Sequence, residues 1–274
     1  METWLTENQT KNMRLSLRIK EILHHEQTEF QELVVVDTLE YGRMLVLDGA
    51  IQTTERDEFT YHEMIAHVPA FAHPAPKRVC VIGGGDGGTV RELLKHPSIE
   101  EIDHVEIDGK VIEASRKYLP TLSSGLDDPR VNSLVTDGIK HVESVENRYD
   151  IIIVDSSDPV GPGVQLFEVP FYTNCYRALA EGGLLVAQTE SPFSEADLLV
   201  KAYRNIAQVF PQTKVYLANV PTYPSGLWSF TCGSKGPDPA KAPEKVEFAT
   251  KYYTPEIHRA AFTLPPFVQE LLEG

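Results

Sequence analysis

The sequence is short of cysteine and of long apolar runs. Its three cysteines, Cys80, Cys175 and Cys232, are scattered among 274 residues and form no metal-type spacing. An odd number of dispersed cysteines is typical of packed thiols in a reducing compartment and argues against a disulfide framework. No run approaches the roughly 20 apolar residues that a membrane helix needs. The first residues, METWLTENQTKNMR, lack the apolar core of a signal peptide, so we expect a cytoplasmic protein.

Basic residues are also in short supply, because 25 Lys and Arg stand against 40 Asp and Glu, for a formal net charge of −15. This charge argues against nucleic acid and anionic membranes as partners, since both would be repelled. It would attract a cationic substrate, although many proteins are acidic only for solubility. The charge therefore becomes informative only if the acids gather where chemistry occurs.

The first quarter of the chain predicts a β-rich region. Residues 14–54 are rich in Val, Leu and Thr, with Tyr-Gly and Asp-Gly turn signals between the apolar runs. Residues 57–71 then carry apolar side chains at helical spacing, which predicts a helix. We expect an N-terminal β-strand domain over residues 1–60.

The remainder of the chain, 61–274, alternates strand and helix patterns from Lys77 onward. One of the helices is expected over 170–183, closed by the Gly182-Gly183 pair. Repeated strand–helix units predict an α/β fold with a parallel, doubly wound sheet. We therefore expect a Rossmann-like catalytic domain after the β-strand domain.

A glycine turn, in the stretch VCVIGGGDGGTVREL, joins the first strand of this part to its helix. Gly83, Gly85 and Gly88 have the G-x-G-x-x-G spacing of a nucleotide site. Thr89 stands where a P-loop would need Lys, so the turn is not a P-loop. Asp86 lies inside the turn, and a carboxylate is a poor neighbour for a pyrophosphate. The place of the turn after a strand and before a helix favours a nucleoside ligand over a merely structural turn.

Acidic residues follow the ends of the predicted strands. Because ligands of such sheets bind beyond the carboxyl ends of the strands, we expect these acids to line one rim. Glu106 follows the second strand, about 20 residues beyond the glycine turn, where an acid accepts hydrogen bonds from ribose hydroxyls. Asp137-Gly138 follows the third strand, where the Asp can accept from an adenine amino group or cap a helix. The rim comprises Asp86, Glu106, Asp108, Asp137, Asp155 and Asp158.

The stretch DSSDP places Asp155 and Asp158 three residues apart in one turn. Asp, Ser and Pro all favour turns, so the pair can serve the backbone alone. At the rim, however, both acids can face one pocket, and neighbouring like charges raise the pKa of at least one carboxyl group. A raised pKa suits a proton acceptor, so we favour a catalytic role.

The stretch YHEMIAH has the spacing H-E-x-x-x-H and not the H-E-x-x-H of a zinc helix. Residues five apart on a helix lie roughly 140° around its axis, so His62 and His67 do not share a face and we predict no metal site. Tyr61 and His62 can instead border the pocket or pack at a helix–sheet junction. Tyr223 and Trp228, on a proline-containing loop, can wall a channel for an aliphatic cation or simply pack.

Together these stretches resemble the polyamine aminopropyltransferase family, in particular bacterial spermidine synthases. The resemblance rests on YHEMIAHVP, VIGGGDGGTVREL, VEID, TDG, DSSDPVGP and PTYPSGLWSF, and extends over nearly the whole chain. It implies a Rossmann-like doubly wound sheet of the S-adenosylmethionine-dependent transferase type, preceded by a small N-terminal β-domain, in a homodimer or homotetramer. It also implies aminopropyl transfer from decarboxylated S-adenosylmethionine, as co-substrate, to putrescine. The products would be spermidine and 5′-methylthioadenosine, and no cofactor is implied.

The resemblance also implies roles for particular residues. Asp155 matches the proton acceptor of the family. Matches to the amine contacts are His62, Asp86 and Asp158, with Tyr61, Glu190 and Tyr223 as additions. Matches to the nucleoside contacts are Gln31, Glu106, Asp137, Gly138 and Pro162, together with the glycines Gly83 and Gly85.

Other functions fit parts of the pattern. An S-adenosylmethionine-dependent methyltransferase would use the same domain and Glu106, but Asp86 would repel the methionine carboxylate. An NAD-dependent oxidoreductase would need a pyrophosphate at the same turn. A non-catalytic nucleoside- or polyamine-binding protein would need no paired acids in DSSDP. Aminopropyl transfer to another amine, such as agmatine or cadaverine, stays open because pocket depth decides it.

Overall fold

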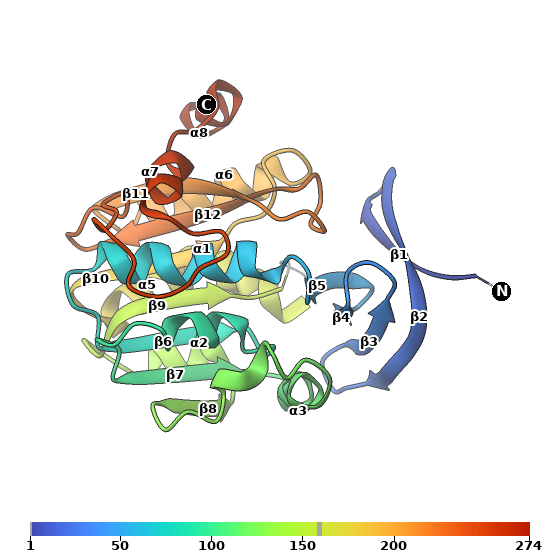
Figure 1. Ribbon diagram of the computed structural model, residues 1–274. Coiled ribbons are helices and arrows are strands. Elements are labelled where there is room, and N and C mark those ends of the chain that lie inside the picture. The colour runs from blue at the N-terminus through green and yellow to red at the C-terminus, as the bar shows by residue number, and fades with distance from the viewer. Residues whose placement is uncertain (1, 158–160) are drawn as a thin grey trace.

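The computed structural model describes residues 2–157 and 161–274. An antiparallel sheet with the strand order β1-β2-β3-β4-β5 forms the N-terminal part. It stands beside a larger sheet, as the blue strands in Figure 1 show. The strands of the smaller sheet are β1 (Thr3–Thr10), β2 (Met13–Gln27), β3 (Glu32–Thr38), β4 (Arg43–Leu47) and β5 (Ala50–Thr54).

The larger sheet has seven strands in the order β11-β12-β10-β9-β6-β7-β8. The pairs from β10 to β8 are parallel, as expected, whereas β12 is antiparallel to both of its neighbours. The sheet is therefore mixed, because β11 and β12 form a hairpin at one edge. Its strands are β6 (Arg78–Gly83), β7 (Glu101–Glu106), β8 (Val131–Val135), β9 (Tyr149–Asp155), β10 (Leu179–Gln188), β11 (Gln212–Asn219) and β12 (Leu227–Ser234).

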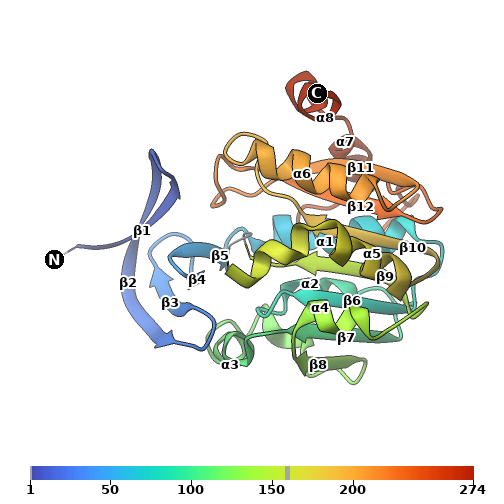
Figure 2. The same cartoon turned by 180° about the vertical axis from the view of Figure 1, so that it is seen from behind.

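Helices cover both faces of the larger sheet, so the Rossmann-like architecture is confirmed. Helices α1 and α2 pack on one face with the core that contains Met64 and Val90, and α4, α5 and α6 cover the opposite face, which Figure 2 presents. The helices are α1 (Glu58–Ala72), α2 (Gly88–Leu93), α3 (Gly109–Tyr118), α4 (Gly138–Glu143), α5 (Val169–Ala178), α6 (Ala196–Ala207), α7 (Pro255–Ala261) and α8 (Pro266–Glu273).

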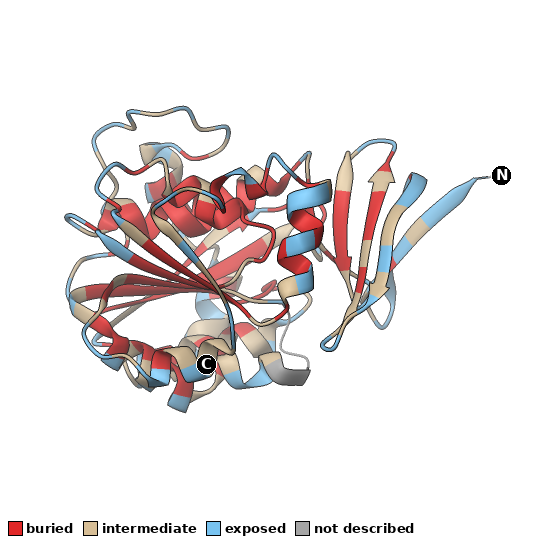
Figure 3. Ribbon diagram, turned by 90° about the horizontal axis from the view of Figure 1, so that it is seen from below, coloured by how far each residue is buried: buried red, intermediate tan, exposed pale blue. Residues whose placement is uncertain are grey.

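Burial follows this layered arrangement. The run Ile151–Ile153 in β9 is completely buried, because helices cover both faces of a central parallel strand. Figure 3 shows buried segments through the larger sheet and its helices, and much more exposed surface on the outer strands of the smaller sheet. The smaller sheet packs Leu33, Val35 and Leu45 against α3. This contact joins the smaller sheet to the Rossmann-like part of the molecule.

Two expectations about local structure were wrong or incomplete. The helix expected over 170–183 ends at Ala178, and the Gly-Gly pair does not close it. Strand β10 starts at the next residue and pairs with β9, with an irregular stretch before Leu184. Gly182, with φ +73°, lies in that stretch, so the glycines bend a strand instead of ending a helix. Strand β1 was not predicted at all, because the β-rich pattern was recognised only from residue 14.

Candidate active site

A cavity of about 530 Å³ lies between the smaller sheet and the carboxyl ends of β6, β7 and β9. Strand-end acids that are far apart in the sequence meet here, because the strands are parallel neighbours. The predicted residues that line it are Gln31, Tyr61, His62, Gly83, Gly85, Asp86, Glu106, Asp137, Gly138, Asp155, Tyr223 and Trp228.

The glycine turn packs tightly against the end of β9. Gly83 and Gly84 have φ values of +82° and +64°, in the left-handed region that favours glycine. A Cβ atom on Gly83 would lie 2.2 Å from the backbone oxygen of Asp155, and one on Gly84 would lie 2.6 Å from its Oδ2. The glycines therefore admit the end of β9, which places Asp155 beside the turn.

The Asp155 carboxylate accepts one hydrogen bond on each oxygen. The hydroxyl of Tyr61 donates to Oδ1 and that of Thr89 donates to Oδ2, both at 2.6 Å. Burial, with the negative charge of nearby Asp86, raises the pKa of Asp155, although the charge of His62 and these two bonds lower it. Each oxygen keeps a further lone pair, so the group can still accept a proton.

Asp86 lies in the same cavity but has a different environment. Its Oδ1 accepts the N–H of Gly88 at 2.6 Å and lies 3.4 Å from Nε2 of His62. The other ring nitrogen of His62 lies 2.6 Å from Oε2 of Glu58. Burial alone would raise the pKa of Asp86, but the charge and hydrogen bond of His62 lower it. The two carboxylates likewise raise the pKa of His62 well above its usual value, against the effect of burial.

Glu106 defines the other end of the cavity. Burial and the charge of Asp108 raise the pKa of Glu106 to about 7, although the N–H of Asp108 donates to its Oε1 at 2.9 Å. Asp108 in turn accepts hydrogen bonds on Oδ2 from Thr28 (2.7 Å) and from Gln31 (3.0 Å). It also caps α3 through the N–H of Lys110. Asp108 therefore ties the loop that carries Gln31 to the strand end that carries Glu106.

Asp137 is the N-cap of α4, and its Oδ1 accepts the N–H of Ile139 at 2.8 Å. The helix-capping role is therefore present, and the side chain also lines the cavity. A Cβ atom on Gly138 would lie 2.4 Å from Cγ2 of Ile82, so only glycine lets α4 approach β6 this closely.

Tyr223 and Trp228 pack edge to face, with ring centroids 4.6 Å apart, and form part of the wall. The hydroxyl of Tyr223 donates to the backbone oxygen of Gln52 at 2.6 Å, which links its loop to the smaller sheet. Trp228 Nε1 is buried and has no hydrogen-bond partner in the described part of the chain.

Three residues with predicted substrate contacts are not among the described residues that line the cavity. Glu190 is buried beside Gln188, whose amide nitrogen lies 3.3 Å from its Oε1, and it does not line the cavity. Pro162 falls in a short 3-10 helix, η2 (Gly161–Phe167), and its side chain is outside the described part of the structure. Asp158 lies outside the described residues.

Sequence reasoning missed several residues of the cavity. Glu7 reaches it from β1, where its Oε1 accepts the N–H of Ile51 at 2.8 Å. Gln52 and Gln188 also line the cavity. No local motif marks these residues, because strand pairing and the packing of the two sheets bring them to the site.

His67 points away from the cavity, as the helical spacing predicted. Its Nδ1 lies 2.9 Å from Nε2 of His96, whereas His62 faces Asp86. Among residues 2–157 and 161–274, no group of three or more His, Cys, Asp or Glu side chains has an arrangement that could hold a metal ion. Within the same residues, no helix has the length and apolar character required to cross a membrane.

The fold and cavity define a Rossmann-like protein with a small-molecule site at the carboxyl edge of its sheet. Residues 58–242 match the spermine/spermidine synthase domain, and residues 3–55 match the spermidine synthase tetramerisation domain. These models cover most of the chain, which therefore belongs to the spermine/spermidine synthase family.

Relatives and solved structures agree with this family. The chain is 54% identical to a polyamine aminopropyltransferase of Shouchella clausii over 100% of both chains, and 53% identical to that of Bacillus subtilis over 99% of both. It superimposes with a TM-score of 0.97 on a spermidine synthase in complex with the transition-state analogue AdoDATO, at 47% identity, covering 99% of this chain and 95% of that one. The Thermotoga maritima spermidine synthase gives a TM-score of 0.95 at 46% identity, with 99% and 94% covered.

Proposed function

We propose that the chain transfers the aminopropyl group of decarboxylated S-adenosylmethionine to putrescine, which gives spermidine and 5′-methylthioadenosine. The observation that carries the proposal is one cavity lined by two strand-end acids, the buried Glu106 at the end of β7 and the half-buried Asp155 at the end of β9. Glu106 suits ribose hydroxyls, and the Asp155 end suits the attacking amine. The family of the chain supports the same reaction.

The attacking amine must lose a proton before it can react. An alkylamine with a pKa near 10.4 is mostly protonated at pH 7, and exposing its lone pair costs roughly 4.6 kcal/mol. We propose that Asp155 orients the amine and accepts that proton as nitrogen attacks the carbon next to the sulfonium. Nitrogen forms a bond to that carbon, and the carbon–sulfur bond breaks with its electron pair left on sulfur. Tyr61 and Thr89 hold the carboxylate in place while the substrates are kept in line.

Asp155→Asn tests this role. The amide keeps the size of the side chain but cannot accept the proton, so we expect turnover to fall by a factor of about 10² to 10⁴. Binding of 5′-methylthioadenosine, measured by calorimetry, should persist because Glu106 is unchanged. Near-normal turnover in this variant would contradict the assignment.

Asp86 suits the amino end of the aminopropyl group. Both of its described contacts use Oδ1, which leaves lone pairs of Oδ2 for an ammonium group. A methionine carboxylate at the same place would be repelled, so we propose that Asp86 selects the decarboxylated co-substrate. Asp86→Asn should narrow the preference of the enzyme for decarboxylated S-adenosylmethionine over S-adenosylmethionine. An unchanged preference would reject this role.

We propose a diamine as the acceptor, because the smaller sheet adds a further carboxylate to the cavity. Glu7 is among the residues that line it, and the distal ammonium of a diamine can bind there. We expect putrescine to react fastest in a panel with cadaverine, agmatine and spermidine, analysed by mass spectrometry. Faster conversion of another amine would correct the acceptor. A methyl gain without methylthioadenosine would instead indicate a methyltransferase.

We also propose that the chain forms a homotetramer through the smaller sheet. The match of residues 3–55 to a tetramerisation domain supports this assembly. Exposed apolar side chains on this part of the molecule support it as well, since such side chains are often covered by a partner. They are Trp4, Met13, Ile22 and Leu39.

A further inference from the structure

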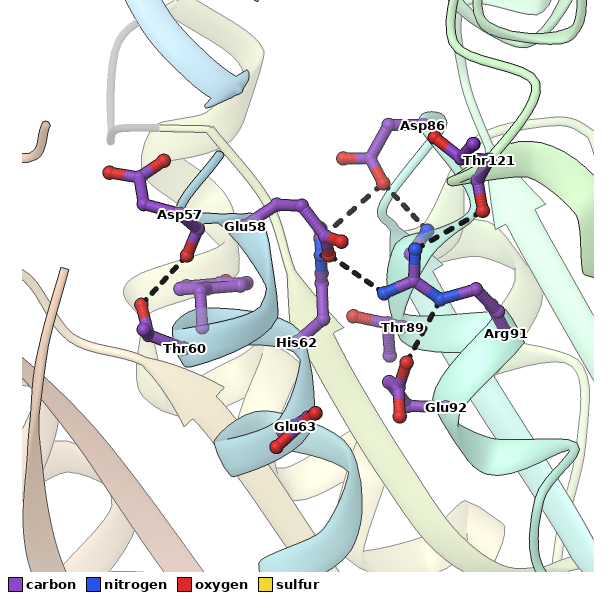
Figure 4. A network of polar contacts seen from close by, with 12 residues as sticks. Asp57, Glu58, Thr60, His62, Glu63, Asp86, Thr89, Arg91, Glu92 and Thr121 are labelled. Carbon is purple, nitrogen blue, oxygen red and sulfur yellow. Dashed lines mark hydrogen bonds and ion pairs between the residues drawn. The ribbon is translucent and has the colours of Figure 1, made fainter. Parts of the chain in front are cut away.

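A chain of ion pairs leads from the cavity to a shallow depression beside α2. It consists of Asp86, His62, Glu58 and Arg91, which we term the ion-pair chain. Arg91 Nη2 donates to Oε2 of Glu58 at 2.8 Å, the oxygen that also contacts His62. Figure 4 shows the four side chains in succession, with Asp86 and Arg91 on the glycine-turn side and Glu58 and His62 on α1.

The ion-pair chain is buried except at its outer end. The side chains of Glu58, His62 and Asp86 are 4%, 3% and 11% exposed, whereas that of Arg91 is 19% exposed. His62 and Asp86 line the cavity. Arg91 does not; it lines a shallow depression beside α2. Arg91 can therefore affect the cavity without entering it, by its charge, which acts on Asp86, and by its contact with Glu58, which in turn contacts His62.

The geometry fixes the charge of each member. Both ring nitrogens of His62 face carboxylate oxygens, so both carry hydrogen and the ring is an imidazolium. Two anions and two cations then alternate along the ion-pair chain and their charges cancel. Arg91 is itself held by Oε1 of Glu92 (2.9 Å) and by the backbone oxygen of Thr121 (3.2 Å). These contacts keep its guanidinium directed at Glu58.

The glycine turn leaves room for the ring in this position. A Cβ atom on Gly88 would lie 2.3 Å from ring atoms of His62, so the third glycine of the motif admits the imidazolium. The ring of His62 lies between Glu58 and Asp86, packed against the backbone of the turn. The charged and titratable groups around its ring are Glu58 and Tyr61 on α1, Asp86 in the turn, Arg91 on α2 and Asp155 on β9.

We propose that Arg91 is a positioning residue for aminopropyl transfer, which fixes Glu58 and thereby holds the His62 imidazolium against Asp86. The inference rests on the proposed function, because its test measures how the protonation of Asp155 limits kcat as the pH changes. Arg91 offsets the buried charge of Glu58, so the proton affinity of Asp155 depends on a residue outside the cavity. Activity that needs ionised Asp155 is lost as the pH falls, and this acid limb reports the local charge.

The pH profile of kcat separates this role from a purely structural one. Arg91→Met leaves the Glu58 charge without its arginine, which favours protonated Asp155, so the acid limb should move up by about half a pH unit or more. Glu58→Gln leaves the Arg91 charge in excess and should move the limb down. The double variant Arg91→Met/Glu58→Gln removes one charge of each sign and should return the limb toward its original position. Arg91→Lys, which keeps the charge, should move it less than Arg91→Met.

Arg130→Met is the matched control. Arg130 lines the same shallow depression, but it contacts Asp128 and the backbone oxygens of Leu94 and Ile99. This control should leave the acid limb unchanged even where it lowers the melting temperature. If Arg91→Met does not fold, a downward shift of the acid limb in Glu58→Gln together with a smaller shift in Arg91→Lys still decides the point.

Identical acid limbs in the unmodified protein and all variants would overturn the proposal, as would shifts of the same sign in Arg91→Met and Glu58→Gln. Failure of the proposed function is a different result, because the unmodified protein would then form no methylthioadenosine from its two substrates.

Discussion

At the scale of single residues, one cavity holds two acids with opposite properties. Burial and a like charge raise the pKa of Asp155, whereas His62 lowers that of Asp86. A pair of carboxyl groups whose pKa values are driven apart can divide the work between proton transfer and charge recognition. The difference arises from neighbours, since Asp155 accepts from two neutral hydroxyls and Asp86 faces an imidazolium.

Glu106 gives a prediction at the same scale. Ribose hydroxyls donate to the carboxylate, so bound nucleoside favours the ionised form of a group whose pKa is about 7 in the empty site. Affinity for 5′-methylthioadenosine should therefore rise with pH, by about tenfold between pH 6 and pH 8. Calorimetry at pH 6, 7 and 8 measures this change. Glu106→Gln cannot ionise and should bind weakly with little pH dependence; a flat profile in the unmodified protein would contradict the role.

At the scale of elements, the ends of strands and helices carry the site, and side chains clamp them together. Asp108 caps α3 and also accepts hydrogen bonds from Thr28 and Gln31 in the loop between β2 and β3. The smaller sheet is thus tied to the Glu106 end of the cavity through the residue that caps α3. A substitution at Asp108 acts on both parts at once.

Asp108→Ala should loosen that connection. Loss of the cap costs about 1 kcal/mol of stability. Release of Gln31 should in addition weaken 5′-methylthioadenosine binding about three- to tenfold. Thermal denaturation and calorimetry measure the two effects. Thr254→Ala is the control, because Thr254 caps α7 through the N–H of Ile257 and does not line the cavity. Equal losses of nucleoside affinity in the two variants would reject a specific role for Asp108.

At the scale of the whole molecule, the smaller sheet has two tasks. It closes the cavity with Glu7, Gln31 and Gln52, and it presents exposed apolar side chains elsewhere. Trp4 and Ile22 are 53% and 58% exposed, which is unusual for such large apolar groups in one small sheet. A homotetramer formed there would leave the larger sheet and its helices free.

The double variant Trp4→Glu/Ile22→Glu should disrupt this assembly, because charged side chains are costly to bury without partners. Analytical ultracentrifugation should show a tetramer for the unmodified protein and smaller species for the variant. Phe193→Glu, at a residue 64% exposed outside the smaller sheet, should leave the mass unchanged. A variant that remains tetrameric would place the interface elsewhere.

Local patterns in the sequence were sufficient for the fold class and for much of the cavity. The alternating strand and helix patterns predicted the Rossmann-like domain, and the rule for parallel strand ends predicted that Glu106, Asp137 and Asp155 line one cavity. The rule holds because the carboxyl ends of parallel strands all lie at the same edge of the sheet. The mixed pairing of β12 and the irregular start of β10 were not predictable, since strand pairing depends on segments distant in the sequence.

By itself the sequence determined where the glycine turn and the strand-end acids stand, because strand periodicity and turn chemistry are local. Only the tertiary structure decided which groups these acids face. In the tertiary structure Asp86 faces His62, which is linked through Glu58 to Arg91. Glu7 lines the cavity, whereas Glu190 does not. The physical reason is that the charge state of a buried acid depends on neighbours supplied by other elements, and packing alone chooses those neighbours.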